Sequence, residues 1–433
     1  MSASAMLMGV SKVDITPLEP IPLAGFGNRT GPYEAISSRL YLRANAFRQQ
    51  VNGQDVTALV VEADIIWWGP ERMAGIRGKL LDRFGIRPEH VILSASHTHG
   101  GPQTTTQFVD MLGLPDAGYM DQLEDWLLQA VGAAISTLEP VSIERGSGTC
   151  QVGINRRKWV NGAMVMAPNP DNYIDTNVEV FRFTAESGAT KAVWMHYTCH
   201  PTVTNLNQVN SDYSGAAMAM LEQSIGGGTV VSFLQGCCGD TRPALFRDDK
   251  FYSGDAEDVR RLGRMLADAV TTVLGRPMKP VPPGKLGGRL IGVDLPYLSL
   301  PSEEEIAATE NAEGLPGQWS VKLRRNPQLL TPSIPLQLSR LDIADGMSFI
   351  AMDGEMVLEY SEKVKRLSGG RALALGYSNG MIGYVPTAKQ VEEGGYEGRD
   401  SSKLFMLPAV FDPRVETVIE QGIQELLQGT DHH

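Results

Sequence analysis

The strongest chemical signal in this sequence is a pair of histidines at the end of an apolar run. His97 and His99 lie in LSASHTHGGPQ, directly after the apolar or small residues 91–96. In an extended segment, side chains two residues apart share one face, so both imidazoles are expected to point the same way. The spacing suits a metal site or a pair of catalytic imidazoles, and the pair alone does not choose between them.

A third histidine and a glutamate follow other apolar runs. His200 is followed by Pro201, which favours an extended conformation at His200, and Glu355 closes the tight turn at 353–355. Catalytic zinc usually takes three protein ligands and keeps one position open for water, so two histidines need one oxygen ligand. Glu355 is a candidate, although an acidic residue at a helix N-terminus is also common. His196 is expected either to approach this site or to serve in packing.

The elements around these residues predict an α/β fold of layered mixed β-sheets with flanking helices. Strands are expected at 58–66, 91–96, 178–183, 192–197 and 229–235, and helices at 71–84, 119–138, 214–224 and 256–274. Five strand ends run into polar stretches, which begin at residues 96, 198, 236, 353 and 377. Ligands in open α/β sheets bind beyond the carboxyl ends of strands, so these stretches are expected to converge on one site.

The later part of the chain contains a change in composition. The Pro/Gly-rich stretch at about 276–300 predicts an irregular crossover within a single domain that spans residues 1–433. Ser302 and Glu305 then fit a capping box and predict a helix through 312. Beyond it we expect a hairpin from 334–343 and 347–352, a helix at 356–367 and a strand at 372–376.

Composition and charge narrow the class of protein. The 433 residues carry a formal net charge of −12 and no long basic run, which argues against a nucleic-acid partner. The N-terminus has no signal-peptide pattern, and no segment approaches the roughly 18 continuous apolar residues of a membrane span. The four cysteines include the adjacent Cys237 and Cys238, a poor start for a disulfide framework. We therefore expect a cytoplasmic protein. Whether the terminal His432 and His433 are native is left open.

Several of these stretches, taken together, resemble the neutral/alkaline ceramidase family. They occur in the family's order and read HTHGGP, TCHPTVTN, NSDYSGAA, LQGCCGDTRP, MDGEMVLE, YSNGMIGYVPT and GGYEG. GVSKVDITP, LAGFG and RLYLRANAF near the N-terminus also resemble the start of that family. The resemblance spans about residues 8 to 400. It implies a ceramidase-like catalytic domain and the activity of a zinc amidase that cleaves the N-acyl bond of ceramide.

The resemblance also implies roles for particular residues. One zinc ion would be held by His97, His200, Glu355 and Tyr384. The groups around the scissile amide would be His99, Arg156 and Tyr396, with His99 and the two tyrosines as catalytic groups. Zinc lowers the pKa of a bound water from 15.7 toward ~7 and polarises the substrate carbonyl. His99 or a tyrosine would then protonate the leaving amine.

Two departures from the family pattern affect the expected substrate. The family's active-site serine, in Gly-Asp-x-Ser-Pro, falls on Arg242. An arginine binds carboxylate or phosphate as a bidentate cation, so Arg242, Arg156 and Gly25 are expected to bind a small anionic amide or ester in place of ceramide. Arg242 could equally pair with a neighbouring aspartate. The chain also ends at His433, so the family's usual C-terminal β-sandwich domain is expected to be missing.

Other readings of the sequence stay open. A cysteine hydrolase would use Cys199, Cys237 or Cys238 as nucleophile with a nearby histidine as base. A true ceramidase and an inactive, metal-stabilised binding protein are further alternatives. The expected partner in the main reading is a small-molecule amide or ester, and a homo-oligomer is left open.

Overall fold

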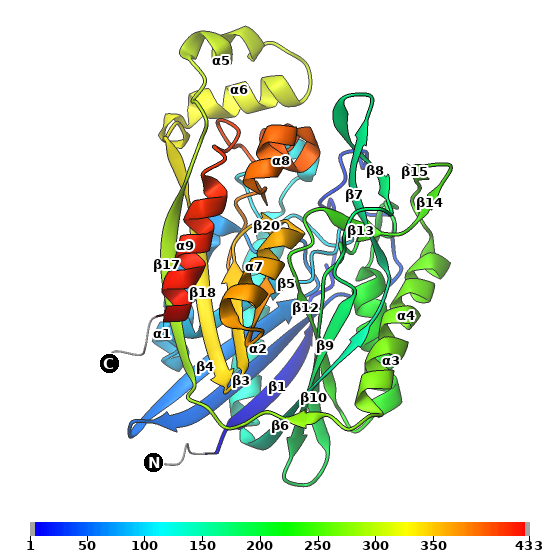
Figure 1. The fold of residues 1–433 in the computed structure, drawn as a ribbon, viewed down its shortest axis with the longest axis vertical. Coiled ribbons are helices and arrows are strands. Elements are labelled where there is room, and N and C mark those ends of the chain that lie inside the picture. The colour runs from blue at the N-terminus through cyan, green and yellow to red at the C-terminus, as the bar shows by residue number, and fades with distance from the viewer. Residues whose placement is uncertain (1–4, 429–433) are drawn as a thin grey trace.

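The chain forms two β-sheets that pack face to face, with helices on their outer surfaces (Figure 1). The computed structural model describes residues 5–428, so the question about His432 and His433 lies outside the described residues. The 9-stranded sheet has the order β12 (Val230–Gln235), β10 (Thr190–Tyr197), β9 (Asn177–Ala185), β6 (Glu139–Thr149), β1 (Leu7–Asp14), β3 (Tyr41–Val51), β4 (Gln54–Ala63) and β5 (Val91–Ala95), and β16 (Lys279–Pro280) pairs with β6. The 4-stranded sheet has the order β17 (Gly287–Pro296), β18 (Ser333–Ala344), β19 (Met347–Met352) and β21 (Ala372–Leu375).

Smaller sheets surround the carboxyl ends of these strands. They are β13 (Thr241–Pro243) with β7 (Gly153–Val160) and β8 (Ala163–Asn169), β2 (Ala35–Ile36) with β11 (Gln208–Val209), β14 (Phe246–Arg247) with β15 (Lys250–Phe251), and β20 (Glu355–Met356) with β22 (Tyr384–Val385). The helices are α1 (Met73–Phe84), α2 (Ala117–Ser136), α3 (Asp212–Ile225), α4 (Ala256–Leu274), α5 (Glu303–Thr309), α6 (Leu315–Arg325), α7 (Leu358–Ser368), α8 (Ala388–Glu393) and α9 (Val415–Gln428). Short 3₁₀ turns occupy Pro70–Arg72, Pro88–His90, Asp110–Leu112 and Pro327–Leu329, and a π-helical turn occupies Tyr396–Asp400.

The core between the two sheets is aromatic. Trp194 of the larger sheet packs against Phe47 of the same sheet, with ring centroids 5.5 Å apart, and against Phe349 of the smaller sheet at 5.8 Å. Successive strand residues face opposite sides, so Ile350 and Met352 face away from this layer and join the core beneath the helices. This alternation explains why five of the six residues of β19 are apolar and why the strand is buried on both faces.

The parallel strand pairs bring the polar strand ends to common edges. β4 pairs with β5, β10 with β12, and β19 with β21, each in parallel. Carboxyl ends of parallel neighbours meet at one edge of a sheet, and ligands bind there. The five polar stretches that follow β5, β10, β12, β19 and β21 do converge, which confirms the expectation from the sequence.

Most of the expected elements are present, with three differences. The stretch 276–300 is irregular only in part, because residues 287–296 form β17 and pair with β18 along their whole length. The prolines that suggested a crossover end before this strand begins. The capping box at Ser302 and Glu305 is confirmed, but its helix ends at Thr309 and not at 312. A second helix, α6, follows it and was not predicted.

Among the described residues, no helix combines the length and apolar character that crossing a membrane requires.

Candidate metal centre and active site

Three expected zinc ligands meet at one buried point. The ligand atoms of His97, His200 and Glu355 all lie within 4.8 Å of one another. The Glu355 Oε2 atom is 3.5 Å from Nε2 of His97 and 3.4 Å from Nε2 of His200. The three side chains come from the ends of β5, β10 and β19, so residues 97, 200 and 355 are brought together only by the pairing of the sheets.

Each histidine of this cluster is oriented by a backbone carbonyl. Nδ1–H of His97 donates to the carbonyl of Ile66 at 2.8 Å, and Nδ1–H of His200 donates to that of Cys238 at 2.7 Å. A carbonyl accepts only from a protonated nitrogen, so Nε2 is the atom of each ring that can offer a lone pair, and it faces Glu355. Burial, together with Arg156, lowers the pKa of His200 to about 4, so this ring is neutral at pH 7. Neutral imidazoles are the form that binds a metal ion.

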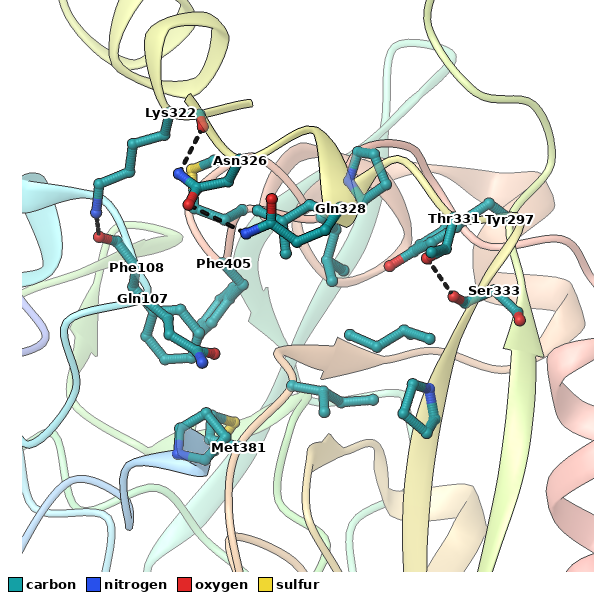
Figure 2. A pocket seen from close by; sticks show the side chains of 18 of the residues that line it. Gln107, Phe108, Tyr297, Lys322, Asn326, Gln328, Thr331, Ser333, Met381 and Phe405 are labelled. Carbon is teal, nitrogen blue, oxygen red and sulfur yellow. Dashed lines mark hydrogen bonds between the residues drawn. The ribbon is translucent and has the colours of Figure 1, made fainter. Parts of the chain in front are cut away.

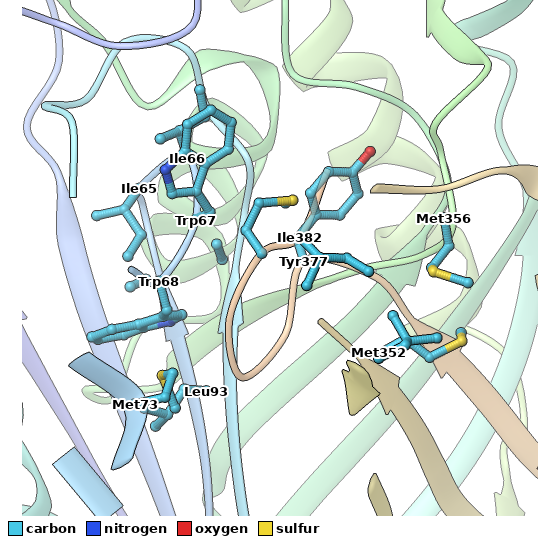
Figure 3. Close-up of a cluster of buried hydrophobic side chains, with 14 of the residues drawn as sticks. Ile65, Ile66, Trp67, Trp68, Met73, Leu93, Met352, Met356, Tyr377 and Ile382 are labelled. Carbon is cyan, nitrogen blue, oxygen red and sulfur yellow. The ribbon is translucent and has the colours of Figure 1, made fainter. Parts of the chain in front are cut away.

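His97 itself departs from the extended conformation expected of it. β5 ends at Ala95, and His97 has a left-handed backbone with φ 66°. The ring of Tyr377 stacks on its imidazole, with centroids 4.1 Å apart. Figure 3 shows Tyr377 and Trp67 within the buried apolar cluster beside the site. The strained backbone at His97 is thus held by packing and by its hydrogen bond to Ile66.

His99 lies next to the cluster but is not one of its three ligand atoms. Its Nε2 is 3.3 Å from Nε2 of His97, and its Nδ1 is buried without a hydrogen-bond partner in the described part of the chain. Burial, together with the neighbouring His97 and His200, lowers the pKa of His99 well below its usual value, so the ring is neutral. The ring of Phe26 packs on it at 4.7 Å. The nitrogen of His99 that faces the cluster is therefore Nε2, whereas the unpartnered Nδ1 lies against Gly25.

Gly25 packs directly against the His99 ring. Its φ is 93°, a value that L side chains rarely adopt, and a Cβ atom at this position would overlap the imidazole. Its N–H donates to the carbonyl of Leu112 at 3.0 Å. Gly25 therefore lies against the His99 ring. A direct contribution of Gly25 to substrate binding stays a prediction.

Tyr384 borders the cluster at His200, and Tyr396 packs on Tyr384. Tyr384 pairs with Glu355 across β20 and β22, and its hydroxyl is 3.4 Å from Nε2 of His200. The ring of Tyr396 packs on that of Tyr384, with centroids 5.2 Å apart. Burial raises the pKa of both hydroxyls, so both tyrosines are protonated at neutral pH. The structure thus brings these two residues to the cluster, as the sequence predicted.

The two predicted substrate-binding arginines have different surroundings. Arg156 is buried; its Nε forms an ion pair with Glu397 at 2.7 Å, and its Nη2 donates to the Tyr384 hydroxyl at 2.9 Å. Arg242 forms no ion pair with any residue from 5 to 428, and the alternative pairing with an aspartate is therefore not seen. Its guanidinium lies 4.3 Å from the centroid of the Phe251 ring.

The remaining candidates have structural roles. His196 donates a hydrogen bond from Nε2 to the carbonyl of Ala374 at 2.8 Å. Of the two roles expected for His196, this contact fits packing. Burial raises the pKa of Cys237 to about 12 and raises that of Cys199 and Cys238 as well. A cysteine nucleophile needs the opposite shift, so the surroundings of these thiols do not support a cysteine hydrolase.

Three residues that contribute to the site were not singled out from the sequence. They are Tyr377 on His97, Glu397 between two arginines, and Phe26 on His99. Each lies in a stretch that had been noted for another residue, namely YSNGMIGY, GGYEG and LAGFG. Sequence gave no signal for their contacts, because the partner of each is at least 70 residues away in the chain.

A cavity of about 640 Å³ lies beside the cluster, behind Phe405. Phe405 lines it and also packs on Tyr384, with ring centroids 5.7 Å apart. Figure 2 shows the polar side chains Lys322, Asn326 and Gln328 along one side of this cavity. None of the predicted catalytic residues lines it, so the cavity is a neighbour of the candidate active site and not part of it.

Residues 6–255 match the family described as neutral/alkaline non-lysosomal ceramidase, N-terminal. The chain belongs to this family. The matched region contains His97, His99, Arg156, His200 and Arg242, whereas Glu355, Tyr384 and Tyr396 lie beyond it. The ceramidase family is thus recognised from about the first 60% of the chain, and the rest of the candidate site is placed by the fold.

Individual ceramidases are similar to this chain at low sequence identity. Neutral ceramidase B of Dictyostelium discoideum is 26% identical over 260 residues, which cover 55% of this chain and 36% of that protein. The match therefore spans little more than a third of that relative's length. The crystal structure of neutral ceramidase from Pseudomonas aeruginosa aligns with a TM-score of 0.76 at 18% identity, over 98% of this chain and 74% of that one. A structure described as ceramidase complexed with C2 aligns with a TM-score of 0.74 at 18% identity, over 98% and 75%. These likenesses confirm the ceramidase-like mixed α/β fold.

Proposed function

We propose that this protein is a zinc-dependent hydrolase that cleaves a non-peptide amide bond or an ester. The observation that carries the proposal is the buried group of His97, His200 and Glu355, whose ligand atoms lie within 4.8 Å of one another. Two histidines and one glutamate are a common ligand set of catalytic zinc. Membership of the ceramidase family supports an amide substrate.

The residues present fit a zinc ion. Both histidines are fixed at Nδ1 by the carbonyls of Ile66 and Cys238, as the histidine ligands of zinc usually are. Glu355 supplies the oxygen ligand. The Tyr384 hydroxyl, 3.4 Å from Nε2 of His200, is the fourth expected ligand. A zinc ion bound here would supply a water activated at neutral pH and would polarise the substrate carbonyl.

The chain's own residues provide the other parts of the reaction. Hydrolysis forms a bond between the water oxygen and the acyl carbon, breaks the bond to nitrogen or the ester oxygen, and gives the leaving group a proton. His99 is neutral and its Nε2 faces the cluster, so it can accept a proton and return it. The protonated Tyr384 and Tyr396 can donate hydrogen bonds to a developing oxyanion, a contribution of roughly 3 to 4 kcal/mol for one such donor. Arg156 holds the Tyr384 hydroxyl in place.

The substrate is expected to be small and anionic, because the cation Arg242 occupies the position of the family's serine. Cleavage of ceramide, the reaction for which the family is named, is the alternative. An inactive, metal-stabilised binding protein is a second alternative. A cytoplasmic location and a single domain across residues 1–433 also stay predictions. The four free, buried cysteines are consistent with a reducing compartment.

Metal removal and a substrate panel test the proposal. Treatment with a chelator should abolish hydrolysis of the best amide or ester, stoichiometric Zn²⁺ should restore it, and iodoacetamide should leave it unchanged. Metal analysis should find one zinc per chain. Zinc binding without hydrolysis across amides, esters and ceramide would favour the inactive binding protein. Loss of activity with iodoacetamide but not with the chelator would contradict the metal mechanism.

A further inference from the structure

The buried arginines near the cluster are neutralised by partners within the chain. Glu397 accepts from Nε of Arg156 at 2.7 Å and from Nη1 of Arg157 at 2.7 Å, and Arg157 also pairs with Glu393 at 3.1 Å. Two carboxylates therefore balance two guanidinium groups. Arg156 also donates a hydrogen bond from Nη2 to the Tyr384 hydroxyl. Neither arginine has a charge left over for a ligand.

The guanidinium of Arg29, on the His99 side of the site, is held by backbone carbonyls. Backbone carbonyls occupy donors on all three of its guanidinium nitrogens: Ala24 and His99 at Nη1, Asn205 at Nε and Leu206 at Nη2. Arg29 thus ties together the loops that carry Gly25 and His99. Its hydrogen bonds make it a structural residue and not a binding group.

Arg242 is the arginine at this site that has neither kind of partner. No carboxylate or carbonyl among residues 5–428 accepts a hydrogen bond from it, and its Nε is buried without a partner. Its guanidinium carbon lies 4.3 Å from the centroid of the Phe251 ring, a contact that uses none of its N–H groups as donors to a polar atom. A partly buried cation without a counter-ion or hydrogen bonds is costly, so a site of this kind favours an anionic ligand.

The backbone places Arg242 next to the metal ligands. It lies on β13, paired with Ile154 of β7, the strand that also carries Arg156. The preceding residue, Thr241, accepts a hydrogen bond from Nδ1 of His200 at 2.9 Å. Arg156 and Tyr384 both act electrostatically on Arg242. Arg242 therefore follows a residue that orients His200, and its charge is within electrostatic reach of Arg156 and Tyr384.

We propose that Arg242, and not Arg156, binds a carboxylate carried by the substrate, so that the preferred substrates are N-acyl amino acids or similar acyl compounds with one negative charge. This inference rests on the proposed function. A guanidinium matches a carboxylate through two parallel hydrogen bonds. One guanidinium balances one negative charge, whereas a phosphate monoester carries about −1.5 to −2 and calls for more donors. The single free arginine thus favours a carboxylate.

A matched pair of substrates tests the inference. N-hexanoylglycine and N-hexanoylethanolamine share the acyl group and the scissile amide, but only the first carries a carboxylate. For the zinc-loaded protein we expect kcat/KM to be about 10- to 100-fold higher for N-hexanoylglycine, which is the range for a hydrogen bond to a charged group. In R242Q the ratio should fall to about one, mainly through KM, and R242K should be intermediate. The control is R247Q, because Arg247 is exposed and also lies on an aromatic ring, that of Tyr252 at 4.9 Å; it should keep the wild-type ratio.

The outcomes separate this inference from the proposed function. A wild-type ratio of one or less, or an unchanged ratio in R242Q, overturns the role of Arg242. If R242Q does not fold, the wild-type ratio and R242K decide. If the zinc-loaded wild type hydrolyses neither these compounds nor any amide or ester of the panel, the proposed function fails instead. Calorimetric titration with N-hexanoylglycine then tests Arg242 alone: weaker binding to R242Q supports it, and equal binding contradicts it.

Discussion

The ring of Tyr377 lies on the imidazole of His97, with ring centroids 4.1 Å apart and planes inclined by 28°. The Tyr377 hydroxyl donates to Oε2 of Glu355 at 3.5 Å and accepts from the thiol of Cys238 at 3.2 Å. The carbonyl of Cys238 in turn holds His200. Tyr377 and Cys238 together contact all three residues of the candidate metal centre. Tyr377 has φ 52°, and this unfavourable conformation is held by the surrounding packing.

We predict that Tyr377→Phe weakens zinc binding by about 10-fold, the lower end of the range for residues that hydrogen-bond to a metal ligand. Phenylalanine keeps the ring on His97 and removes the hydroxyl, and with it the hydrogen bond to Glu355 and the one from the Cys238 thiol. Competition with a fluorescent zinc indicator measures the change in affinity. Tyr173→Phe is the matched control, because it removes an exposed hydroxyl that bonds to Glu362 at 3.3 Å. Equal affinity in both variants would show that the Tyr377 hydroxyl has no role at the metal.

His97 and His99 should differ although they are two residues apart. His97→Ala is expected to lose the metal, because it removes one of three ligands. His99→Ala is expected to keep the metal and to lose about 10²- to 10⁴-fold in kcat, the usual contribution of a general acid or base. Metal analysis after dialysis and steady-state kinetics give the two readouts. If both variants lost zinc equally, this division of roles would have to be abandoned.

Substitution of Gly25 should disturb His99 as well as the backbone. A Cβ at Gly25 overlaps the His99 ring, and the residue has φ 93°. Gly31 has φ 71° and open space around it, so Gly31→Ala adds backbone strain alone. We expect about 1 to 3 kcal/mol of destabilisation from strain in either variant, and a loss of kcat only in Gly25→Ala. Urea unfolding and activity assays separate the two effects. A similar kcat for both variants would contradict the link between Gly25 and His99.

Glu397→Gln should destabilise the fold strongly. Glu397 is buried and accepts from both Arg156 and Arg157, so its neutralisation leaves buried positive charge without a partner. Breaking a buried ion pair in this way costs about 3 to 5 kcal/mol. Asp412→Asn, at an exposed pair with Arg414, should cost under about 1 kcal/mol. The free energies of unfolding in urea give the comparison, and equal values for the two variants would refute the prediction.

Local patterns in the sequence were sufficient for many of the elements and for the identity of the reactive residues, although β1, β3, β6 and α9 were not predicted. The apolar runs before residues 97, 200 and 355 predicted buried strands that end in polar loops, and the structure has β5, β10 and β19 there. The capping box at Ser302 and Glu305 was readable because its partners are three residues apart. The family resemblance added Tyr384 and Tyr396, which periodicity did not distinguish from structural aromatic residues. Strand β17 was missed, since glycines and prolines at both ends obscured its pattern.

The relative placement of these residues was decided only by the tertiary structure. Glu397 neutralises Arg156 across 241 positions in the chain, and Tyr377 reaches His97 across two sheets. Such contacts depend on which strands pair and how the sheets pack, and residue types alone do not encode a partner at long range. The sequence by itself therefore determined which groups can do the chemistry. The tertiary structure determined which of them are already neutralised: Glu397 is bound by Arg156 and Arg157, whereas Arg242 has no ion pair within residues 5–428.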